Sequence, residues 1–171
     1  IHEQGYIYYD LKPENIVLLK EIKTVHDVNV RLIDFDFMET KDNAKKKKPE
    51  QGSRLYSAPE VFKVYRNTSS DKEDFVRHHT EKIDIFSFGI FTIVLLTKNY
   101  NAFNIKHETP AFKDGSVFIN PEFINPEFIN PVSEFNKLFK LAKSCLTLEP
   151  EDRPDINRVI ETLESMKSET P

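Results

Sequence analysis

The sequence predicts an α+β fold that is mostly helical, and three observations carry this prediction. Two short apolar runs near the start, residues 15–19 and 28–35, have the β-branched content of strands. Residues 82–97 form a longer run that is apolar almost throughout. Residues 134–166 repeat apolar side chains at helical spacing. Strands that come first and helices that follow are typical of an α+β unit.

Composition limits the classes of protein to which the chain can belong. Its length of 171 residues is enough for one folded domain. With 39% apolar and 30% charged residues, its composition is that of an ordinary globular protein. The net charge of −4 gives no support to a nucleic-acid partner. The single cysteine, Cys145, cannot form an internal disulfide, which fits an intracellular protein of the cytoplasm or nucleus. The longest apolar run contains Asp84 and is too short to span a membrane.

The first two runs are expected to pair with each other. "NIVLL" and "VNVRLIDF" are joined by the polar stretch "KEIKTVHD", and this arrangement predicts a β-hairpin. Residues 36–60 are expected to be mostly irregular, because Pro49, Gly52 and Pro59 interrupt them. The lysine run at 45–48 is typical of a solvated loop.

The long run at 82–97 predicts a helix that is buried on every side. Gly89 lowers the helix propensity of this run, which indicates a close packing contact at that position. Residues 118–131 are a five-residue repeat, "FINPEFINPEFINP", and proline at every fifth position excludes a continuous helix or a central strand. We expect a replicated insertion in a loop, with aromatic-mediated partner binding as the alternative.

Two helices are expected to follow the repeat. Ser133 is suited to cap the first of them, over residues 134–146. Asp155 is suited to cap the second, which ends near residue 166. The predicted apolar face of the first helix consists of Phe135, Leu138, Phe139 and Ala142. The predicted apolar stripe of the second consists of Ile156, Val159, Ile160, Leu163 and Met166.

Four polar residues have the chemistry of a phosphoryl-transfer site. Such a site needs a base for the attacking hydroxyl, a cation beside the phosphate, and hard oxygen ligands for Mg²⁺. Asp10, Lys12 and Asn15 offer these groups on one short loop, and the hairpin would bring Asp34 close to Asn15. Taken alone, Asp10 and Asn15 are also consistent with simple turn caps.

Five ordered motifs resemble those of eukaryotic protein kinases. "DLKPEN" is similar to the catalytic loop of that family and "DFD" at 34–36 to its D-F-G motif. "GSRLYSAPE" resembles the end of the activation segment, "DIFSFGIFTIVLLT" the buried F-helix, and "EPEDRPD" the run before the last helix. The resemblance implies the C-terminal lobe of a kinase, with a small β-hairpin at the catalytic site.

The resemblance also implies roles for individual residues. Asp10 would be the catalytic base and Lys12 would stabilise the phosphate, while Asn15 and Asp34 would hold Mg²⁺. The implied activity is that of a serine/threonine protein kinase, with ATP as co-substrate and a protein hydroxyl as acceptor.

Five further residues match positions that support such a site. Ser53 and Tyr56 belong to the activation segment, where the Ser53 hydroxyl would touch the catalytic acid and lysine. Asp84 would accept backbone N–H groups of the catalytic loop. Glu60 and Arg153 would form a buried ion pair that fixes the activation segment to the lobe.

Three positions depart from the family pattern. Tyr8 and Tyr9 replace a histidine and an arginine, and the arginine would normally receive an activation-loop phosphate. Activation by phosphorylation of that loop is therefore not expected. Asp36 replaces the glycine of D-F-G, where its carboxylate either adds a metal contact or hinders the loop.

The motifs of an N-terminal lobe are absent, so we expect residues 1–166 to be a partial kinase domain. The repeat is then an insertion in it, and residues 167–171 are a tail. The missing lobe would leave apolar surface exposed around Ile1, Ile7 and the helix at 82–97. Such a fragment is expected to be inactive alone. The alternative is a non-catalytic pseudokinase or scaffold, which Tyr9, Asp36 and the repeat favour.

Overall fold

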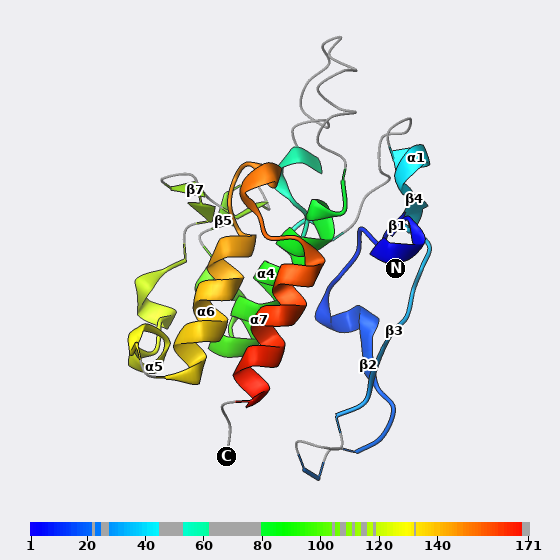
Figure 1. Ribbon diagram of the computed structural model, residues 1–171. Helices are drawn as coiled ribbons and strands as arrows, with labels where there is room; N and C mark the ends of the chain where they lie inside the picture. Colours follow the sequence, from blue (N-terminus) through cyan, green and yellow to red (C-terminus); the bar gives the residue numbers. More distant parts are fainter. Residues whose placement is uncertain are drawn as a thin grey trace.

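The longest helix runs through the middle of the molecule. The computed structural model describes residues 1–21, 23–24, 28–44, 53–61, 80–103, 105–106, 109–110, 112–113, 116–117, 119–131 and 133–168. Helix α4 (Lys82–Thr97) lies behind α6 (Glu134–Cys145) and α7 (Ile156–Ser168) in Figure 1, and strands β2 (Ile16–Leu18) and β3 (Val30–Leu32) lie to the right of these helices. The lysine run at 45–48 lies outside the described residues, as do residues 169–171 of the expected tail at 167–171, while residues 167 and 168 belong to α7.

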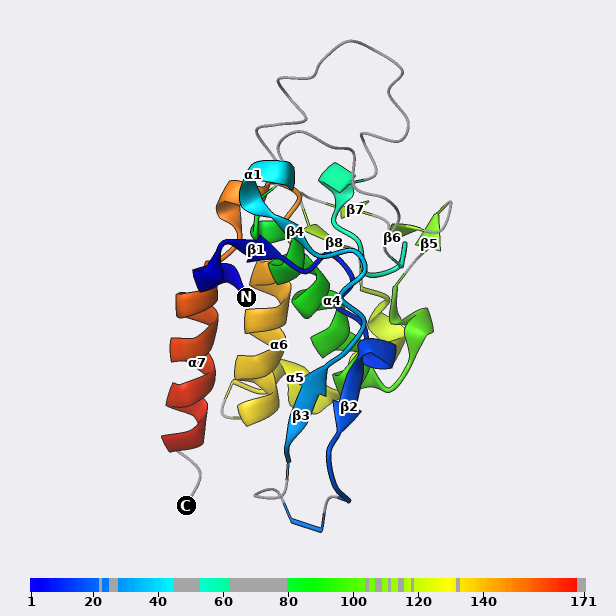
Figure 2. The same cartoon turned by 90° about the vertical axis from the view of Figure 1, so that its right-hand side faces the viewer.

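The predicted hairpin is confirmed. Strands β2 and β3 are antiparallel, and Ile16 lies opposite Leu32 while Leu18 lies opposite Val30. Residues paired in this way point to the same face of the hairpin. Figure 2 shows the hairpin extending away from the helices, and its outer end is apolar and open, with Leu18 54% and Val30 50% exposed.

Short elements interrupt the segment that was expected to be irregular. Strand β4 (Glu39–Thr40) pairs antiparallel with β1 (Tyr6–Ile7), which leads into the catalytic-loop motif. The one-turn helix α1 (Lys41–Ala44) follows, and Thr40 Oγ1 accepts a hydrogen bond from the backbone N–H of Asn43 at 3.1 Å. Two-residue strands leave no alternation in the sequence, so no pattern could have predicted β1 or β4.

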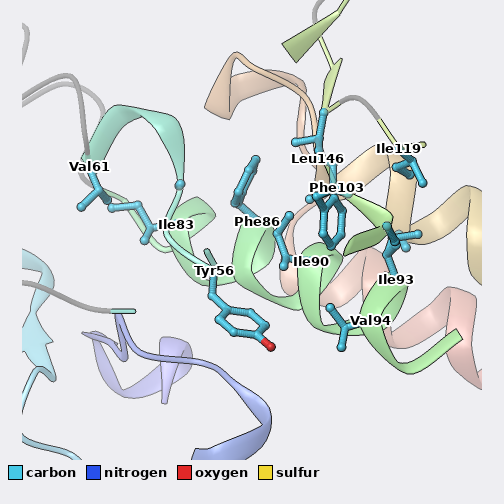
Figure 3. Packing of buried hydrophobic residues seen from close by; sticks show 14 of the residues in the cluster. Tyr56, Val61, Ile83, Phe86, Ile90, Ile93, Val94, Phe103, Ile119 and Leu146 are labelled. Carbon is cyan, nitrogen blue, oxygen red and sulfur yellow. The ribbon is translucent and has the colours of Figure 1, made fainter. Parts of the chain in front are cut away.

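Helix α4 is confirmed with the predicted bounds, and it forms the centre of the core. Ile83, Phe86, Ile90 and Ile93 are completely buried (Figure 3). The principal cluster also includes Tyr56, Phe103, Ile119 and Leu146. Among the described residues no helix has the length and apolar character needed to cross a membrane.

Gly89 brings α4 close to the end of α6, as its position in the sequence predicted. A Cβ atom at residue 89 would lie 2.8 Å from Leu146 Cγ and 2.9 Å from Cys145 Cβ. Gly89→Ala is therefore expected to destabilise the protein by about 1–2 kcal/mol, because overpacking outweighs the gain in helix propensity. Urea unfolding would measure this loss. The control, Lys140→Ala at an exposed position of α6, should change stability by less than about 0.5 kcal/mol.

Both terminal helices begin at the predicted caps. Ser133 Oγ accepts a hydrogen bond from the N–H of Phe135 at 3.2 Å, and Asp155 Oδ1 accepts one from the N–H of Arg158 at 2.8 Å. Two members of the predicted apolar faces are largely exposed, Phe135 at 53% and Ile160 at 44%. Phe135 lies in the first turn of α6, where its ring centre is 6.2 Å from that of Phe128 on α5, and Ile160 lies at the edge of its stripe.

The repeat forms separate helical turns rather than a continuous element, as predicted. The short helices η5 (Pro121–Phe123) and α5 (Pro126–Ile129) each begin at a proline. The asparagine before each proline caps its turn: Asn120 accepts from Glu122 N–H and Asn125 from Glu127 N–H. The remaining short elements were not predicted: η4 (Tyr100–Ala102), β5 (Ile105–Lys106), β6 (Thr109–Pro110), β7 (Phe112–Lys113), β8 (Ser116–Val117) and η6 (Pro150–Asp152).

The expected exposure of apolar surface is found in part. Ile1 is 40% exposed, but Ile7 is completely buried and belongs to the core cluster of α4. The expectation for Ile7 was therefore wrong, because β1 packs onto the molecule next to β4. The helix at 82–97 is also mostly buried, with Leu95 as its exposed exception. The open apolar surface lies instead on the β2–β3 hairpin.

Candidate active site

Asp10 is the centre of a hydrogen-bonded cluster. Its Oδ2 accepts from Lys12 Nζ at 2.7 Å and from Asn15 Nδ2 at 2.9 Å. Its Oδ1 accepts from the backbone N–H of Ser53 at 2.9 Å. Lys12 Nζ also contacts Ser53 Oγ at 2.9 Å, so four residues from two distant segments form one cluster. Pro13 begins the short helix η2 (Pro13–Asn15) and fixes the backbone between the lysine and the asparagine.

These contacts control the charge of Asp10, which is 2% exposed. Burial would raise the pKa of its carboxyl, but the hydrogen bonds from Lys12, Ser53 and Asn15 outweigh burial and lower the pKa below its ordinary value. A carboxyl with a lowered pKa is ionised at neutral pH. Asp10 therefore presents a negative charge beside the Lys12 cation at physiological pH.

Asp84, in the first turn of α4, anchors the loop that carries Asp10. Its Oδ1 accepts from Tyr9 N–H and its Oδ2 from Tyr8 N–H, both at 2.8 Å. His2, on the short helix η1 (His2–Gln4), contacts the same Oδ2 through Nε2 at 2.7 Å. Because charge-assisted bonds to a buried carboxylate are strong, the two residues before Asp10 are fixed to the core helix.

Asp34 lies beside the cluster, at the end of β3. The backbone N–H of Ile33 donates to the carbonyl of Asn15 at 3.0 Å, which extends the hairpin ladder up to Asp34. Tyr8 contacts both neighbours of Asp34: its hydroxyl donates to the Ile33 carbonyl, and its ring packs edge-on against Phe35 at 5.6 Å. Asp34 itself is exposed and has a φ of 61°.

The residues expected to hold Mg²⁺ fit that ion. Asn15 uses its Nδ2 in the cluster, which leaves the Oδ1 atom for another contact, and the Asp34 carboxylate is exposed nearby. Amide and carboxylate oxygens are the ligands that Mg²⁺ prefers. Among the described residues there is no cluster of three or more His, Cys, Asp or Glu side chains that could hold a metal ion. A Mg²⁺ ion bound by Asn15 and Asp34 would therefore need further ligands, such as water and phosphate oxygens.

The departures at Tyr9 and Asp36 have different structural consequences. Asp36 lies in a turn in which Met38 N–H donates to the Phe35 carbonyl at 3.0 Å, and it does not have a positive φ. This backbone therefore does not require glycine at position 36. Tyr9 has a φ of 69° and is 5% exposed in the core cluster. Burial, together with nearby carboxylates that include Glu39, raises the pKa of its hydroxyl, so the side chain is neutral.

Glu60 and Arg153 form a buried bidentate ion pair. Arg153 donates to Glu60 Oε1 at 2.6 Å and to Oε2 at 2.8 Å, and the two residues are 2% and 7% exposed. The guanidinium also donates to three backbone carbonyls, and it lies 5.0 Å from the centre of the Phe86 ring. The charge of the buried guanidinium is thus balanced by a carboxylate, and its N–H groups have hydrogen-bond acceptors, as a buried cation requires.

Ser53 and Tyr56 hold the activation-segment motif in place. The hydroxyl of Ser53 contacts Lys12, whereas the contact to Asp10 comes from the Ser53 peptide N–H rather than from the hydroxyl. Tyr56 is 5% exposed and lies among the buried residues in Figure 3. Its carbonyl accepts a hydrogen bond from Ser87 Oγ on α4 at 2.8 Å. Burial raises the pKa of the Tyr56 hydroxyl. Tyr56 is therefore packed into the core, not directed at a substrate.

Sequence reasoning missed His2 and underrated Tyr8. Tyr8 was expected only to fill the space of a histidine, yet it contacts both residues that flank Asp34. His2 stands far from Asp84 along the chain, and a lone histidine before a short strand carries no sequence signal for such a contact.

Comparison with known proteins agrees with this arrangement. The family model for the protein kinase domain matches residues 1–163. The Raf homolog serine/threonine-protein kinase of Caenorhabditis elegans is 25% identical over 95% of the chain and 19% of that protein. The meiosis-specific serine/threonine-protein kinase mek1 of Schizosaccharomyces pombe is 28% identical over 67% of the chain and 25% of that protein.

A third relative, the receptor-like kinase TMK2 of Arabidopsis thaliana, is 28% identical over 95% of the chain and 18% of its own length. The chain thus spans a quarter or less of each of these relatives. The family model covers nearly all of the chain, and the matched region contains the cluster around Asp10, the Asp84 anchor and the Glu60–Arg153 pair. The chain belongs to the protein kinase family.

Proposed function

We propose that the protein containing this chain is a serine/threonine protein kinase, which transfers the γ-phosphate of ATP to a hydroxyl of a protein substrate. One observation carries the proposal: Asp10, Lys12, Asn15 and Ser53 are joined by hydrogen bonds of 2.7–2.9 Å. The lysine and proline that follow Asp10 support the serine/threonine class, as does the similarity of the chain to two serine/threonine-protein kinases.

The geometry supports a specific route for the substrate hydroxyl. A carboxylate oxygen can accept about two hydrogen bonds. Oδ2 of Asp10 already accepts two, from Lys12 and Asn15, whereas Oδ1 accepts one, from Ser53. The hydroxyl of the substrate would therefore donate to Oδ1, which orients its oxygen for attack and receives its proton. Because Asp10 is 2% exposed, this contact requires a local opening of the structure around its carboxylate.

The other charged groups would act on the phosphate. Lys12 is 20% exposed and can turn its ammonium group toward the transferred phosphoryl group while it remains near Asp10. Mg²⁺ held by Asn15 and Asp34 would neutralise charge on the phosphate oxygens. Tyr8 would keep the Asp34 backbone in register with Asn15, through its contacts to Ile33 and Phe35.

The exposed apolar residues of the hairpin support an upper lobe above this site. Leu18, Val28 and Val30 are each at least 50% exposed. We infer that further polypeptide packs there and completes the nucleotide site, and that residues 1–166 are a partial kinase domain with a short tail. On this basis residues 1–171 alone are expected to lack kinase activity, and the protein would act inside the cell.

A non-catalytic scaffold is the second candidate, and the burial of Asp10 favours it. Both carboxylate oxygens are hydrogen bonded within the chain, and a pseudokinase could keep such a cluster for structural reasons alone. The replacement of the phosphate-binding arginine by Tyr9 agrees with this reading.

Binding of Mg²⁺·ATP to the intact protein separates the two candidates. A kinase is expected to show a rise in melting temperature with Mg²⁺·ATP and phosphotransfer to serine or threonine peptides. Asp34→Asn should reduce both, because one of the two proposed metal ligands loses its charge. Asp155→Asn is the matched control, since Asn caps a helix as well as Asp. A wild-type protein without a nucleotide-dependent shift would favour the scaffold.

A further inference from the structure

Two units of the five-residue repeat have the same sequence and the same local structure. Residues 120–124, the first unit, and residues 125–129, the second unit, both read "NPEFI". In each unit the asparagine side chain accepts a hydrogen bond from the glutamate N–H, at 3.1 Å in the first and 2.9 Å in the second. The N–H groups of Phe123 and Phe128 donate to the carbonyl of the same asparagine, at 3.1 Å and 2.8 Å. Either unit therefore has the residues that form the helix α5.

Only the second unit packs against α6, and α5 lies beside that helix in Figure 1. Phe128 is 5% exposed, and its ring stacks on Phe139 with the ring centres 5.6 Å apart. Asn136, which is also 5% exposed, donates from Nδ2 to the Phe128 carbonyl at 2.7 Å. These contacts require a phenyl ring and a main-chain carbonyl, and the first unit offers both. The surface of α6 therefore does not distinguish the two units by their side chains.

Contacts at the start of the repeat favour the observed register. The N–H of Asn120 donates to the Ala102 carbonyl at 2.8 Å, and Ile119 forms a β-bridge with Phe103. Ile119 is 8% exposed, whereas Phe123 packs against the core only in part. A shift of the chain by one unit would break the contacts of Asn120 and Ile119. The shifted register is therefore the less stable one, a minor state of the wild-type protein.

The repeat allows a shift in one direction only. Moving the first unit onto α6 repeats every residue of α5 and lengthens the connection to α6 by five residues. The entropic cost of a longer loop rises only with the logarithm of its length. The opposite shift would bring residues 130–134, "NPVSE", to α6 and put Ser133 in the place of Phe128. It would also remove Ser133 from its position as the N-cap of α6.

We propose that the repeat is a register switch on α6. When the second unit leaves the surface of α6, the first unit takes its place. Phe123 then stacks on Phe139, and Asn136 donates to the Phe123 carbonyl. The second unit is released into the connection before α6. The switch uses none of the residues around Asp10, so it does not depend on the proposed kinase function.

Stability measurements on the intact protein test whether a spare ring fills the place of Phe128. Phe139→Ala is the matched control for Phe128→Ala, because it removes the other ring of the same stacked pair and the repeat cannot replace it. We expect the urea midpoint to fall in Phe128→Ala by no more than half of its fall in Phe139→Ala. In Phe123→Ala/Phe128→Ala no spare ring is left in the two units, so the fall should match that of Phe139→Ala.

Cleavage by a glutamate-specific protease shows which unit is released. Glu122 and Glu127 have the same place in the two units, and both are exposed. In Phe128→Ala we expect cleavage after Glu127 to become at least about tenfold faster, because the second unit has left α6. Cleavage after Glu122 should stay within about threefold of the wild-type rate. In the double variant both sites should be cleaved faster, since neither unit can pack on α6.

Equal acceleration at Glu122 and Glu127 in Phe128→Ala would overturn the proposal, because the whole segment would then have unfolded. Unchanged cleavage at both sites would overturn it as well, and so would a Phe128→Ala variant as unstable as the double variant. If Phe128→Ala does not fold, Asn125→Ala replaces it, because this change removes only the cap of the second unit. It should raise cleavage after Glu127 alone, and adding Phe123→Ala should abolish that rise. A rise that persists with Phe123→Ala would show fraying of the second unit without a shift and would contradict the switch.

Discussion

The Asp10→Asn variant is expected to lose phosphotransfer by about 10²–10⁴-fold, the range that general acid–base groups contribute. At neutral pH the carboxylate is ionised, because Lys12, Ser53 and Asn15 lower its pKa. The amide removes this charge and cannot accept a proton from the substrate hydroxyl. The amide also cannot keep all the hydrogen bonds of the carboxylate, because Oδ2 accepts from two donors and Oδ1 from one. Either orientation of the amide points an N–H at another donor. Peptide phosphorylation by the intact protein measures the loss.

Nucleotide binding separates lost chemistry from lost structure in this variant. Asp10 is not one of the proposed metal ligands, so the thermal shift with Mg²⁺·ATP should remain in Asp10→Asn, whereas Asp34→Asn should reduce it. Asp155→Asn should retain full activity, because it changes an exposed helix cap. An Asp10→Asn variant that phosphorylates peptides at the wild-type rate would contradict the proposed role of Asp10.

The cluster on the loop that carries Asp10 could be predicted from the sequence because its members are close together. Asp10, Lys12 and Asn15 lie within six residues, and the neighbouring runs have strand character that the hairpin confirms. The contact of Ser53 with Asp10 spans 43 residues, and that of Asp84 with Tyr8 spans 76. No local pattern relates such distant positions, so the expectation that they support the site came from the family resemblance.

Some features could not be predicted even with that resemblance. Strand β4 has two residues and owes its structure to pairing with β1, which is a tertiary contact. Ile160 fits the helical stripe but is 44% exposed, because helical periodicity gives the direction of a side chain and not the extent of the neighbouring helix. For Asp36 the turn from Phe35 to Met38 shows a backbone without a positive φ, and the two alternatives for its carboxylate, a metal contact or hindrance of the loop, stay predictions.

The Arg153→Leu variant is expected to destabilise the protein by about 3–5 kcal/mol, the cost of leaving a buried charge unpaired. Glu60 is 7% exposed and would lose both bonds of its bidentate contact. The carbonyls of Lys82, Thr147 and Leu148 would lose a donor as well. Urea unfolding of the variant measures the loss. Arg158→Leu, which removes an exposed pair on α7, should cost less than about 1 kcal/mol.

A double variant distinguishes the charge from the remaining contacts. Glu60→Leu/Arg153→Leu removes the unpaired carboxylate, so it should be more stable than Arg153→Leu alone. Recovery should still be incomplete, because the three carbonyls remain without the guanidinium and the contact with Phe86 is lost. The double variant could instead be less stable than the single one. The stability lost in Arg153→Leu would then come from packing and carbonyl contacts, and not from the unpaired Glu60 carboxylate. Ser53 and Tyr56 keep their own hydrogen bonds to Asp10 and Ser87, so the loss in Arg153→Leu is expected to be one of stability rather than of the geometry around Asp10.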